Sequence, residues 1–466
     1  MAPSDLHPSI SASSRFSRVR KRLLRPLREL AAGARALHPA KLVFLGYVWY
    51  IAAGWLLLSL PYAQKGKGAG ALDSLFIAAS AVSTTGLVTV SIADSYTFLG
   101  QAVILVLIQL GGIGYMTVGS FLILSRRADL PALHSEVGRA VFSLPVSFRL
   151  DKFIRSVVRF TLAIELLGAA ALYVLFRRAG VEEPLWSAVF HSVSAFCTAG
   201  FSLNNDSFER FAGDFWVNAV IAALSYLGAM GFIVCVDFWR MLRGKIREMT
   251  LTSKIILWTT FWLSAGGTAL IFLTEPSIRR MPVDERLLAA FFQAMTAMTT
   301  VGFNTIPTGG LAKASVLLVV LLMVIGASPS GTGGGIKSTT FSAVLGVMRS
   351  AMHGEKEVRF WGRPIPLERI WMACASLGFY LSALLIGTYL LELTERAPFE
   401  KIIFEAASAL GTVGLSMGIT GELTHLGKII VAALMFCGRV GPLTFGAALF
   451  CRRGGGPEEK DADLAV

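Results

Sequence analysis

The sequence is organised around one stretch, Thr299-Thr300-Val301-Gly302-Phe303-Asn304. An apolar segment too short to cross a bilayer precedes it, and an apolar run long enough to cross follows it. Three similar stretches occur in comparable contexts: Thr84-Thr85-Gly86-Leu87, Thr198-Ala199-Gly200-Phe201 and Thr412-Val413-Gly414-Leu415. Their glycines recur at nearly even intervals of a little over one hundred residues, which indicates four copies of one unit.

The central segment, Thr300-Val301-Gly302-Phe303, resembles the filter of potassium channels, in which backbone carbonyl oxygens replace the water around the ion. One such tripeptide is common, so the interpretation depends on the fourfold recurrence. Glycine easily adopts the backbone angles that turn successive carbonyls inward. The alternative is that the four glycines mark ordinary turns, but a turn needs neither the threonine nor a short apolar segment before it. We therefore predict a backbone-carbonyl filter built from all four stretches.

The composition is that of an integral membrane protein. The mean hydropathy is +0.63, only 16% of the residues are charged, and the apolar runs are continuous. Continuous runs of about 20 residues predict membrane-spanning helices, whereas a barrel would show short alternating strands. Five cysteines without a C-x-x-C pair favour neither a disulfide framework nor a zinc site.

The net charge of +13 is distributed between the units rather than gathered on a soluble domain, which argues against nucleic-acid binding. Lysine and arginine mark the cytoplasmic side of membrane proteins. The basic residues at 126–159, 240–254, 349–369 and 452–453 therefore predict a multi-pass protein of the cell membrane with both termini in the cytoplasm. The basic segment 1–41 is expected to be a cytoplasmic arm that precedes a retained first helix, and a transit peptide is the alternative.

Each unit reads as a span, a half-helix, a filter segment and a returning span. The first half-helix, 73–83, would be about 16 Å long at 1.5 Å per residue, too short for a hydrocarbon core of about 30 Å. The fold class predicted is an all-α membrane protein with eight transmembrane helices and four half-helices, in four parallel repeats around one pseudo-fourfold pore. The predicted spans and half-helices are 42–60, 73–83 and 98–124; 153–176, 185–196 and 216–238; 255–273, 287–298 and from 315; and 370–391, 399–410 and 429–450. The predicted regions are the arm 1–41, the repeats 42–127, 128–247, 248–350 and 351–453, and a disordered tail 454–466.

The returning span of the third unit is interrupted by the glycine-rich segment 326–337. A phosphate-binding loop would need a glycine directly before Lys337, where Ile336 stands, and a helix-packing motif would space its glycines four apart. Irregular backbone at membrane depth survives where it is buried or lines a cavity. We therefore predict a gating loop. Its candidate residues are Ser330, Gly331, Thr332, Gly333, Gly334, Gly335 and Lys337.

Arg439 lies in the middle of the last predicted span, within Gly438-Arg439-Val440-Gly441-Pro442. An arginine at membrane depth is costly unless it faces a polar cavity. We expect it to project into the pore near the glycine-rich segment and restrain cations, although snorkelling or a purely structural bond to a carbonyl would also explain it. Five other polar residues are expected to bridge helices rather than bind ions: Gln109, Glu165, His191, Asn218 and Glu405. His191 lies on a half-helix, so a packing role there is the plain interpretation. No catalytic constellation is present in the sequence, so an enzyme is not predicted.

In combination, these features resemble the Trk/Ktr/HKT superfamily of cation transporters, and within it the Ktr membrane subunit. The resemblance covers residues from about 42 to 453 and includes Ser-Gly-Thr-Gly-Gly-Gly-Ile-Lys and Gly-Arg-Val-Gly-Pro-Leu-Thr. It implies a homodimer with one pore per protomer, whose loop gate is driven by a cytosolic ring of nucleotide-binding regulators. It also implies potassium selectivity, because a glycine rather than a serine stands at position 86.

The function predicted is channel-like potassium uptake, with no covalent cofactor, sodium as a candidate activator, and nucleotide bound only by the regulatory partner. One alternative is a sodium-permeable or non-selective cation channel. An ion-coupled transporter of an organic substrate is less favoured, since such folds commonly have inverted repeats.

Overall fold

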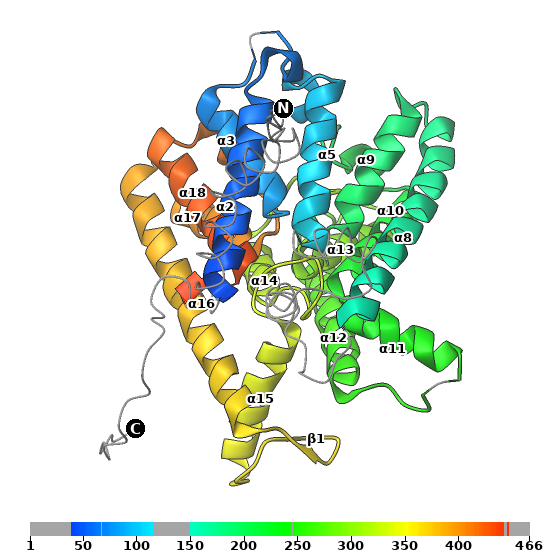
Figure 1. The fold of residues 1–466 in the computed structure, drawn as a ribbon, viewed down its shortest axis with the longest axis vertical. Helices are drawn as coiled ribbons and strands as arrows, with labels where there is room; N and C mark the ends of the chain where they lie inside the picture. The colour runs from blue at the N-terminus through cyan, green and yellow to red at the C-terminus, as the bar shows by residue number, and fades with distance from the viewer. Residues whose placement is uncertain (1–38, 67, 115–149, 245, 442–444, 447–466) are drawn as a thin grey trace, which may run out of the picture.

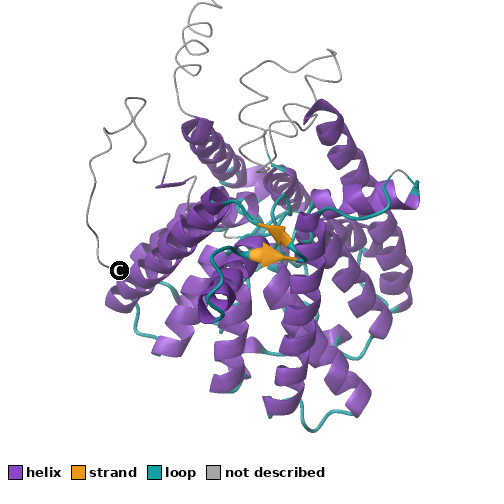
Figure 2. Cartoon of the chain, turned by 90° about the horizontal axis from the view of Figure 1, so that it is seen from below, coloured by secondary structure: helices purple, strands orange, loops and turns teal. Residues whose placement is uncertain are grey.

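The computed structural model describes residues 39–66, 68–114, 150–244, 246–441 and 445–446. This part of the chain is almost entirely helical (Figure 1). Its only two strands among the described residues, β1 (Arg359–Phe360) and β2 (Arg363–Pro364), pair antiparallel in a small hairpin. The hairpin lies at the lower end of the molecule in Figure 1 and faces the viewer in Figure 2. The predicted tail, most of the predicted arm and the junction 115–149 lie outside the described residues.

The elements follow one another in a regular order. The first group is α2 (Pro39–Leu58), η1 (Pro61–Ala63), α3 (Ala71–Val82), α4 (Ile92–Ser95) and α5 (Phe98–Ile113). The second is α8 (Leu150–Arg178), α9 (Pro184–Phe196), η2 (Glu209–Phe211), α10 (Phe215–Ala229) and α11 (Phe232–Leu242). The third is α12 (Leu251–Thr274), α13 (Val283–Thr299), η3 (Thr308–Gly310), α14 (Lys313–Val324) and α15 (Ser338–Met352). After the hairpin come α16 (Leu367–Thr394), α17 (Phe399–Gly411), η4 (Thr420–Glu422) and α18 (His425–Val440).

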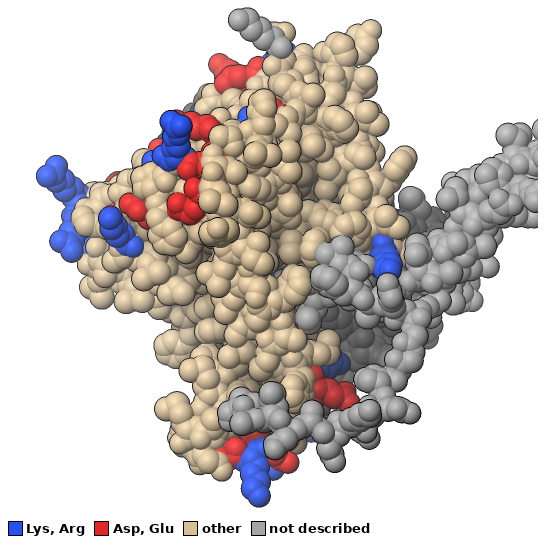
Figure 3. Space-filling model, turned by 90° about the vertical axis from the view of Figure 1, so that its left-hand side faces the viewer, with Lys and Arg blue, Asp and Glu red and all other residues tan. Residues whose placement is uncertain are grey.

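Among the described residues, four helices are long and apolar enough to cross a membrane: α2, α8, α12 and α16. Their outer faces expose large apolar side chains, for example Trp371 and Leu385 on α16 at 69% and 67% exposure. In Figure 3, a broad uncharged surface lies between charged side chains at the top and bottom of the face shown. Such a surface is stable against lipid, so the molecule is a helical membrane protein with several apolar spans.

The helices α3, α9 and α17 have 12 or 13 residues, and α13 has 17. The helix α13 is longer than predicted because it begins at Val283, where Asp284 and Glu285 occupy its first turn. Each of the four packs against the long helix before it in the chain. Their last halves are buried except for the partly buried Val193, so these short helices form the centre of the molecule rather than its lipid-facing surface.

Side-chain caps fix where the returning helices begin. Thr97, Asp214 and Thr424 accept hydrogen bonds from backbone N–H groups in the first turns of α5, α10 and α18. The helix α14 begins after Ala312, which has no capping side chain, and Glu275 at the end of α12 accepts from the Ala312 N–H instead, at 3.1 Å. At each of the four returning helices, a side chain therefore accepts from at least one N–H group at the helix start.

The predicted continuous span over 216–238 is wrong. The chain bends by 100° between α10 and α11, where Gly231 has a φ of 84°. The predicted spans 98–124 and 429–450 are also interrupted, since α5 ends at Ile113 before Gly114 (φ 86°) and α18 ends at Val440 before Gly441 (φ 87°). A right-handed helix cannot continue through a positive φ, and glycine is the residue that adopts it without strain. Hydropathy indicates which segments are apolar but not their backbone angles, so it could not predict these helix breaks.

Candidate functional site

Four loops that follow the short helices share an unusual backbone. Thr84, Thr198, Thr300 and Thr412 have left-handed φ values of 52°, 48°, 58° and 49°. The glycine two residues later in each loop also has a positive φ, of 92°, 67°, 82° and 94° in chain order. A left-handed conformation is strained for a β-branched residue, and such strain gathers at functional sites. Four repetitions of it mark these loops as one site.

The four loops contact one another in a closed ring. A methyl group added to each glycine would overlap with the backbone carbonyl oxygen of the residue before the next glycine. The overlaps are Gly86 with Ala199, Gly200 with Val301, Gly302 with Val413, and Gly414 with Thr85. The fourth loop thus closes on the first, and only glycine fits at the four contacts. We call these residues, 84–87, 198–201, 300–303 and 412–415, the ring.

An equivalent backbone hydrogen bond joins each ring loop to the last turns of the short helix before it. The N–H before each ring glycine donates to the carbonyl five residues earlier, at 2.8–3.1 Å; the pairs are Thr85 with Ser80, Ala199 with Ser194, Val301 with Thr296, and Val413 with Ser408. The ring is therefore positioned by four helix ends that converge on it.

Hydroxyl groups behind the ring were missed by the sequence analysis. The residue six before each ring glycine is a serine or threonine, and alanine follows it in every copy: Ser80-Ala81, Ser194-Ala195, Thr296-Ala297 and Ser408-Ala409. The hydroxyls of Ser80 and Ser408 accept from the N–H of Gly86 and Gly414, at 3.1 and 3.0 Å. Comparing the four copies upstream of the glycine, as [Ser/Thr]-Ala-x-x-Thr-x-Gly, would have found this position.

The glycine-rich segment 326–337 lies directly against the ring threonines. The hydroxyls of Thr332 and Thr198 are 3.0 Å apart, and the Thr84 hydroxyl lies 3.4 Å from the carbonyl oxygen of Thr332. The Thr300 hydroxyl accepts from the N–H of Gly334 at 3.3 Å, and a methyl group at Gly334 would overlap with the Thr412 hydroxyl. One short piece of chain therefore touches the same threonine position in all four loops.

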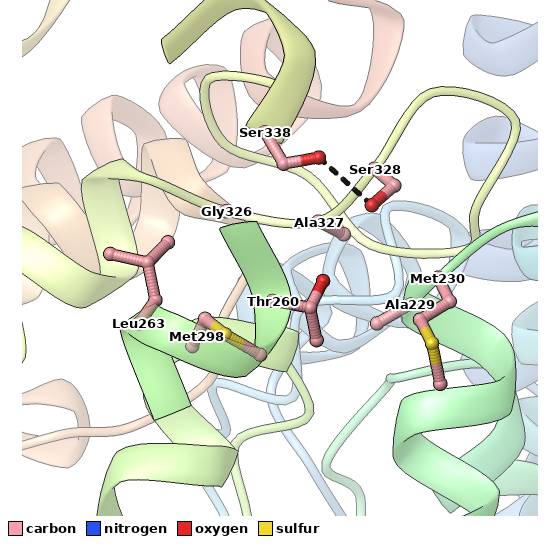
Figure 4. A pocket seen from close by; sticks show the side chains of 9 residues that line it. All are labelled: Ala229, Met230, Thr260, Leu263, Met298, Gly326, Ala327, Ser328 and Ser338. Carbon is pink, nitrogen blue, oxygen red and sulfur yellow. Dashed lines mark hydrogen bonds between the residues drawn. The ribbon is translucent and has the colours of Figure 1, made fainter. Parts of the chain in front are cut away.

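The segment is fastened to the break between α10 and α11. The N–H of Ser328 donates to Ala229 O at 3.0 Å, the N–H of Thr332 to Gly228 O at 3.1 Å, and the N–H of Phe232 to Ser330 O at 3.3 Å. Figure 4 shows the Ser328 hydroxyl near the start of the segment beside the hydroxyl of Ser338, the first residue of α15; the two oxygens are 2.9 Å apart. The segment is thus an ordered loop, and the glycine break that hydropathy missed is its attachment point.

Arg439 points at this loop from α18. Its guanidinium donates to the carbonyl oxygen of Thr332 and to those of Gly111 and Gly112 at the end of α5, the last at 3.2 Å. On the side of the loop away from the ring lies a cavity of about 540 Å³, lined by Ser330, Gly331, Gly333, Gly335, Lys337 and Arg439 among others. The Lys337 ammonium turns back onto Gly333 O at 2.7 Å. Six of the eight predicted gate residues therefore line one cavity, and the other two, Thr332 and Gly334, lie between them in the chain.

The other predicted polar residues divide into two kinds. Gln109 on α5 donates to Glu165 on α8 at 3.0 Å, as expected of residues that bridge helices. Asn218 instead donates to the carbonyls of Phe211 and Asp214 in its own segment. Glu405 bonds to residues that follow the ring, so helix bridging was the wrong interpretation for Asn218 and Glu405. His191 packs against Phe176 and Phe208, as expected of a residue on a half-helix, and it also bonds to Ser202 after the ring.

Fold and site together define a multi-pass helical membrane protein in which four loops surround one centre. A profile of the TrkH family, described as "Cation transport protein", matches residues 51–450. The chain belongs to this family, as its motifs predicted, and is a membrane cation transporter rather than an enzyme.

Two relatives and one solved structure extend the comparison. The chain is 35% identical to Ktr system potassium uptake protein B of Bacillus subtilis, over 87% of this chain and 92% of that protein. It is 33% identical to potassium/sodium uptake protein NtpJ of Enterococcus hirae, over 88% and 92%. The fold matches the crystal structure of the potassium transporter TrkH from Vibrio parahaemolyticus with a TM-score of 0.71 and 18% identity, over 87% of this chain and 83% of that one.

Proposed function

We propose that this protein takes up potassium ions through a channel-like pore whose selectivity filter is the ring. The closed contact of the four loops supports this best, because it gathers the carbonyl oxygens of four equivalent segments around one axis. Carbonyl oxygens can replace the hydration shell of a dehydrated potassium ion. The four units would then be parallel repeats around a pseudo-fourfold axis.

The helix ends support a cation as the cargo. The helices α3, α9, α13 and α17 all end at the ring, so their C-terminal ends converge there. The carbonyl end of a helix carries a partial negative charge of roughly half a unit. Four such ends stabilise a cation at the ring, and an anion would be repelled.

The loop 326–337 and Arg439 form the proposed gate. The loop occupies the space next to the ring threonines, and Arg439 places a fixed positive charge beside Thr332. A cation that leaves the ring must pass both. Opening then requires the loop to leave its bonds with Gly228 and Ala229, which a movement of α10 or α11 would accomplish.

The assembly proposed is a homodimer controlled by a cytosolic ring of nucleotide-binding regulator subunits. The name of the Bacillus subtilis relative, a protein of a Ktr system, supports such a partner. The termini are proposed to be cytoplasmic. A negative-inside potential then favours inward movement by about 2.3 kcal/mol per charge per 100 mV.

The test is a reversal potential in proteoliposomes that contain the purified protein, with potassium on one side and sodium on the other. A potential near the potassium limit supports the proposal, and clear current with a potential near zero contradicts selectivity. The variant Gly86→Ser should shift the potential toward zero, since a side chain at Gly86 overlaps with Ala199 O and forces two loops apart.

Sodium permeation is the second candidate function. It is favoured by the similarity to a protein named for both potassium and sodium uptake. Leu87 and Ala199 also depart from the Thr-Val-Gly-aromatic pattern of the central stretch. The same reversal potential distinguishes the two candidates.

A further inference from the structure

A second recurring position on the short helices lies nine residues before each ring glycine. It is occupied by Ile77 on α3, His191 on α9, Gln293 on α13 and Glu405 on α17. All four side chains are completely buried. A buried polar group is costly unless it forms hydrogen bonds, so the partners of the three polar side chains indicate what the position does.

His191 holds the chain that leaves the second ring loop. Its Nδ1 lies 2.8 Å from the carbonyl oxygen of Ser187 and therefore carries the proton. Its Nε2 then accepts from the Ser202 hydroxyl at 3.0 Å and from the N–H of Leu203 at 3.3 Å. The ring of Phe208 meets the imidazole edge-on at a centroid distance of 5.1 Å and restricts its orientation. The imidazole is thus a neutral, oriented acceptor.

Glu405 does the same for the fourth ring loop. Its Oε2 accepts from the Ser416 hydroxyl at 2.8 Å, and its Oε1 accepts from the Thr420 hydroxyl. Ser416 stands two residues after Gly414, as Ser202 stands two residues after Gly200. Two different side chains on two helices therefore hold the same point of two loops.

The first and third loops lack this attachment. Ile77 has no polar atom, and neither the oxygen nor the nitrogen of the Gln293 amide has a partner within the described part of the chain. Each ring glycine contacts the next loop in chain order, so the second and fourth loops face each other across the ring. The attachment to a loop's own short helix therefore exists on one diagonal of the ring and is missing on the other. The equivalent residue of the third loop, Asn304, bonds instead to Ser207 and Glu209 of the second unit.

We propose that His191 and Glu405 are positioning residues that set the ion selectivity of the ring by fixing the outer ends of two opposite loops, an inference that rests on the proposed filter. Each acts through a serine two residues beyond the ring glycine. The carbonyls of a loop held at both ends keep their distance from the axis when the smaller sodium ion enters. A loop released at its outer end can close around sodium.

The experiment compares His191→Leu with Gln293→Leu by reversal potential in the proteoliposomes described above. His191→Leu should lower the potassium-to-sodium permeability ratio by about three- to tenfold, the range expected for the loss of about one net hydrogen bond. Gln293→Leu, the matched change at the equivalent position, should leave the ratio as in the wild type. His191→Gln should restore it, since an amide can accept from Ser202, and amide and carboxylate side chains already occupy this position on α13 and α17.

Ser202→Ala keeps the test decisive if His191→Leu does not fold, because it removes the other half of the contact at a partly exposed site. It should lower the ratio in the same direction by a smaller factor. Equal ratios for the wild type, His191→Leu and Ser202→Ala overturn the inference, as does an equal loss in Gln293→Leu. A wild-type ratio near one overturns the proposed filter itself, so the two failures are distinct.

Discussion

Arg439 on α18 donates a hydrogen bond to the backbone carbonyl oxygen of Thr332, 107 residues earlier in the chain. Through this bond the only arginine among the described residues of α18 holds the loop that lies against the ring. The same guanidinium donates to the last turn of α5, so it joins three segments at one point. A positive charge in this position both fastens the loop and opposes the approach of a cation.

Replacing Arg439 with alanine is expected to raise potassium flux. At roughly 6–10 Å and an effective dielectric constant of about 20, one fixed charge opposes a monovalent cation by about 2–3 kcal/mol. The gain should therefore be at least about tenfold in proteoliposomes without a regulator. Arg177→Ala on the exposed end of α8 is the control. Unchanged flux and gating in Arg439→Ala would show that the arginine is only structural.

Replacing Gly302 with alanine is expected to abolish selective conduction. The added methyl group overlaps with the Val413 carbonyl, and the φ of 82° is unfavourable for alanine. Gly266→Ala in the middle of α12 is the matched control, since its methyl group meets no atom within 4 Å and alanine favours a helix. Retained potassium selectivity in Gly302→Ala, measured as a reversal potential, would contradict the closed ring.

The sequence predicted the features that are visible as a local pattern of residue types. The ring residues, the loop 326–337 and Arg439 could be predicted because fourfold spacing, contiguous glycines and a charge in an apolar run are visible in the letters alone. Hydropathy also placed α2, α8, α12 and α16 within a few residues of their observed bounds. These features depend on composition and local order, which the sequence contains directly.

The features that were missed depend on geometry across the chain. Gly231 was interpreted as part of a helix because its neighbours are apolar, and only contact with Ser330 and Gly331 explains its positive φ. The bond between His191 and Ser202 was missed because residue spacing does not show that the chain after the ring folds back toward the short helix. Hydrogen bonds to loop residues follow no sequence periodicity, so they could not be predicted from the spacing of residue types.

Acidification on the outer side of the ring, where the chain leaves the ring loops, is expected to reduce cation flux because Glu209 gains a proton there. Burial raises the pKa of this carboxyl group, with a further rise from Asp206, although the Asn304 amide that donates to it at 2.8 Å opposes the shift. Glu209 therefore gains its proton at a higher pH than an ordinary glutamate. Protonation removes a negative charge next to the ring, where it would attract the cation.

Flux measured while the pH on that side is lowered should fall in the wild type, with a midpoint above the usual range of a glutamate. Glu209→Gln, which is neutral at every pH, should remove this phase. Asp284→Asn on α13 is the control, since it changes a carboxyl group in the first turn of a short helix, away from the ring. A profile that is the same in Glu209→Gln and the wild type would exclude Glu209 as the titrating group.

Asp237 on α11 is expected to stabilise the protein by holding α11, which contacts the loop 326–337, against α12. Its Oδ2 accepts from the Thr250 hydroxyl, the Thr250 N–H and the Ser253 hydroxyl at 2.6, 3.2 and 2.7 Å, and so clamps α11 to the start of α12. Asp237→Ala loses charge-assisted bonds worth about 1.5–3 kcal/mol, so the detergent-solubilised protein should unfold at a lower temperature. Glu248→Ala removes only an exposed pair with Lys254, worth less than about 1 kcal/mol, and is the control.

The same variant should also change gating, because α11 begins beside the glycine that contacts the loop. Gly231 lies against Pro329 and Gly331, and the N–H of Phe232 donates to Ser330. Freed from α12, α11 holds these bonds less firmly, and the open fraction of single channels should rise in Asp237→Ala. A lower unfolding temperature with an unaltered open fraction would mean that α11 stabilises the fold without controlling the loop.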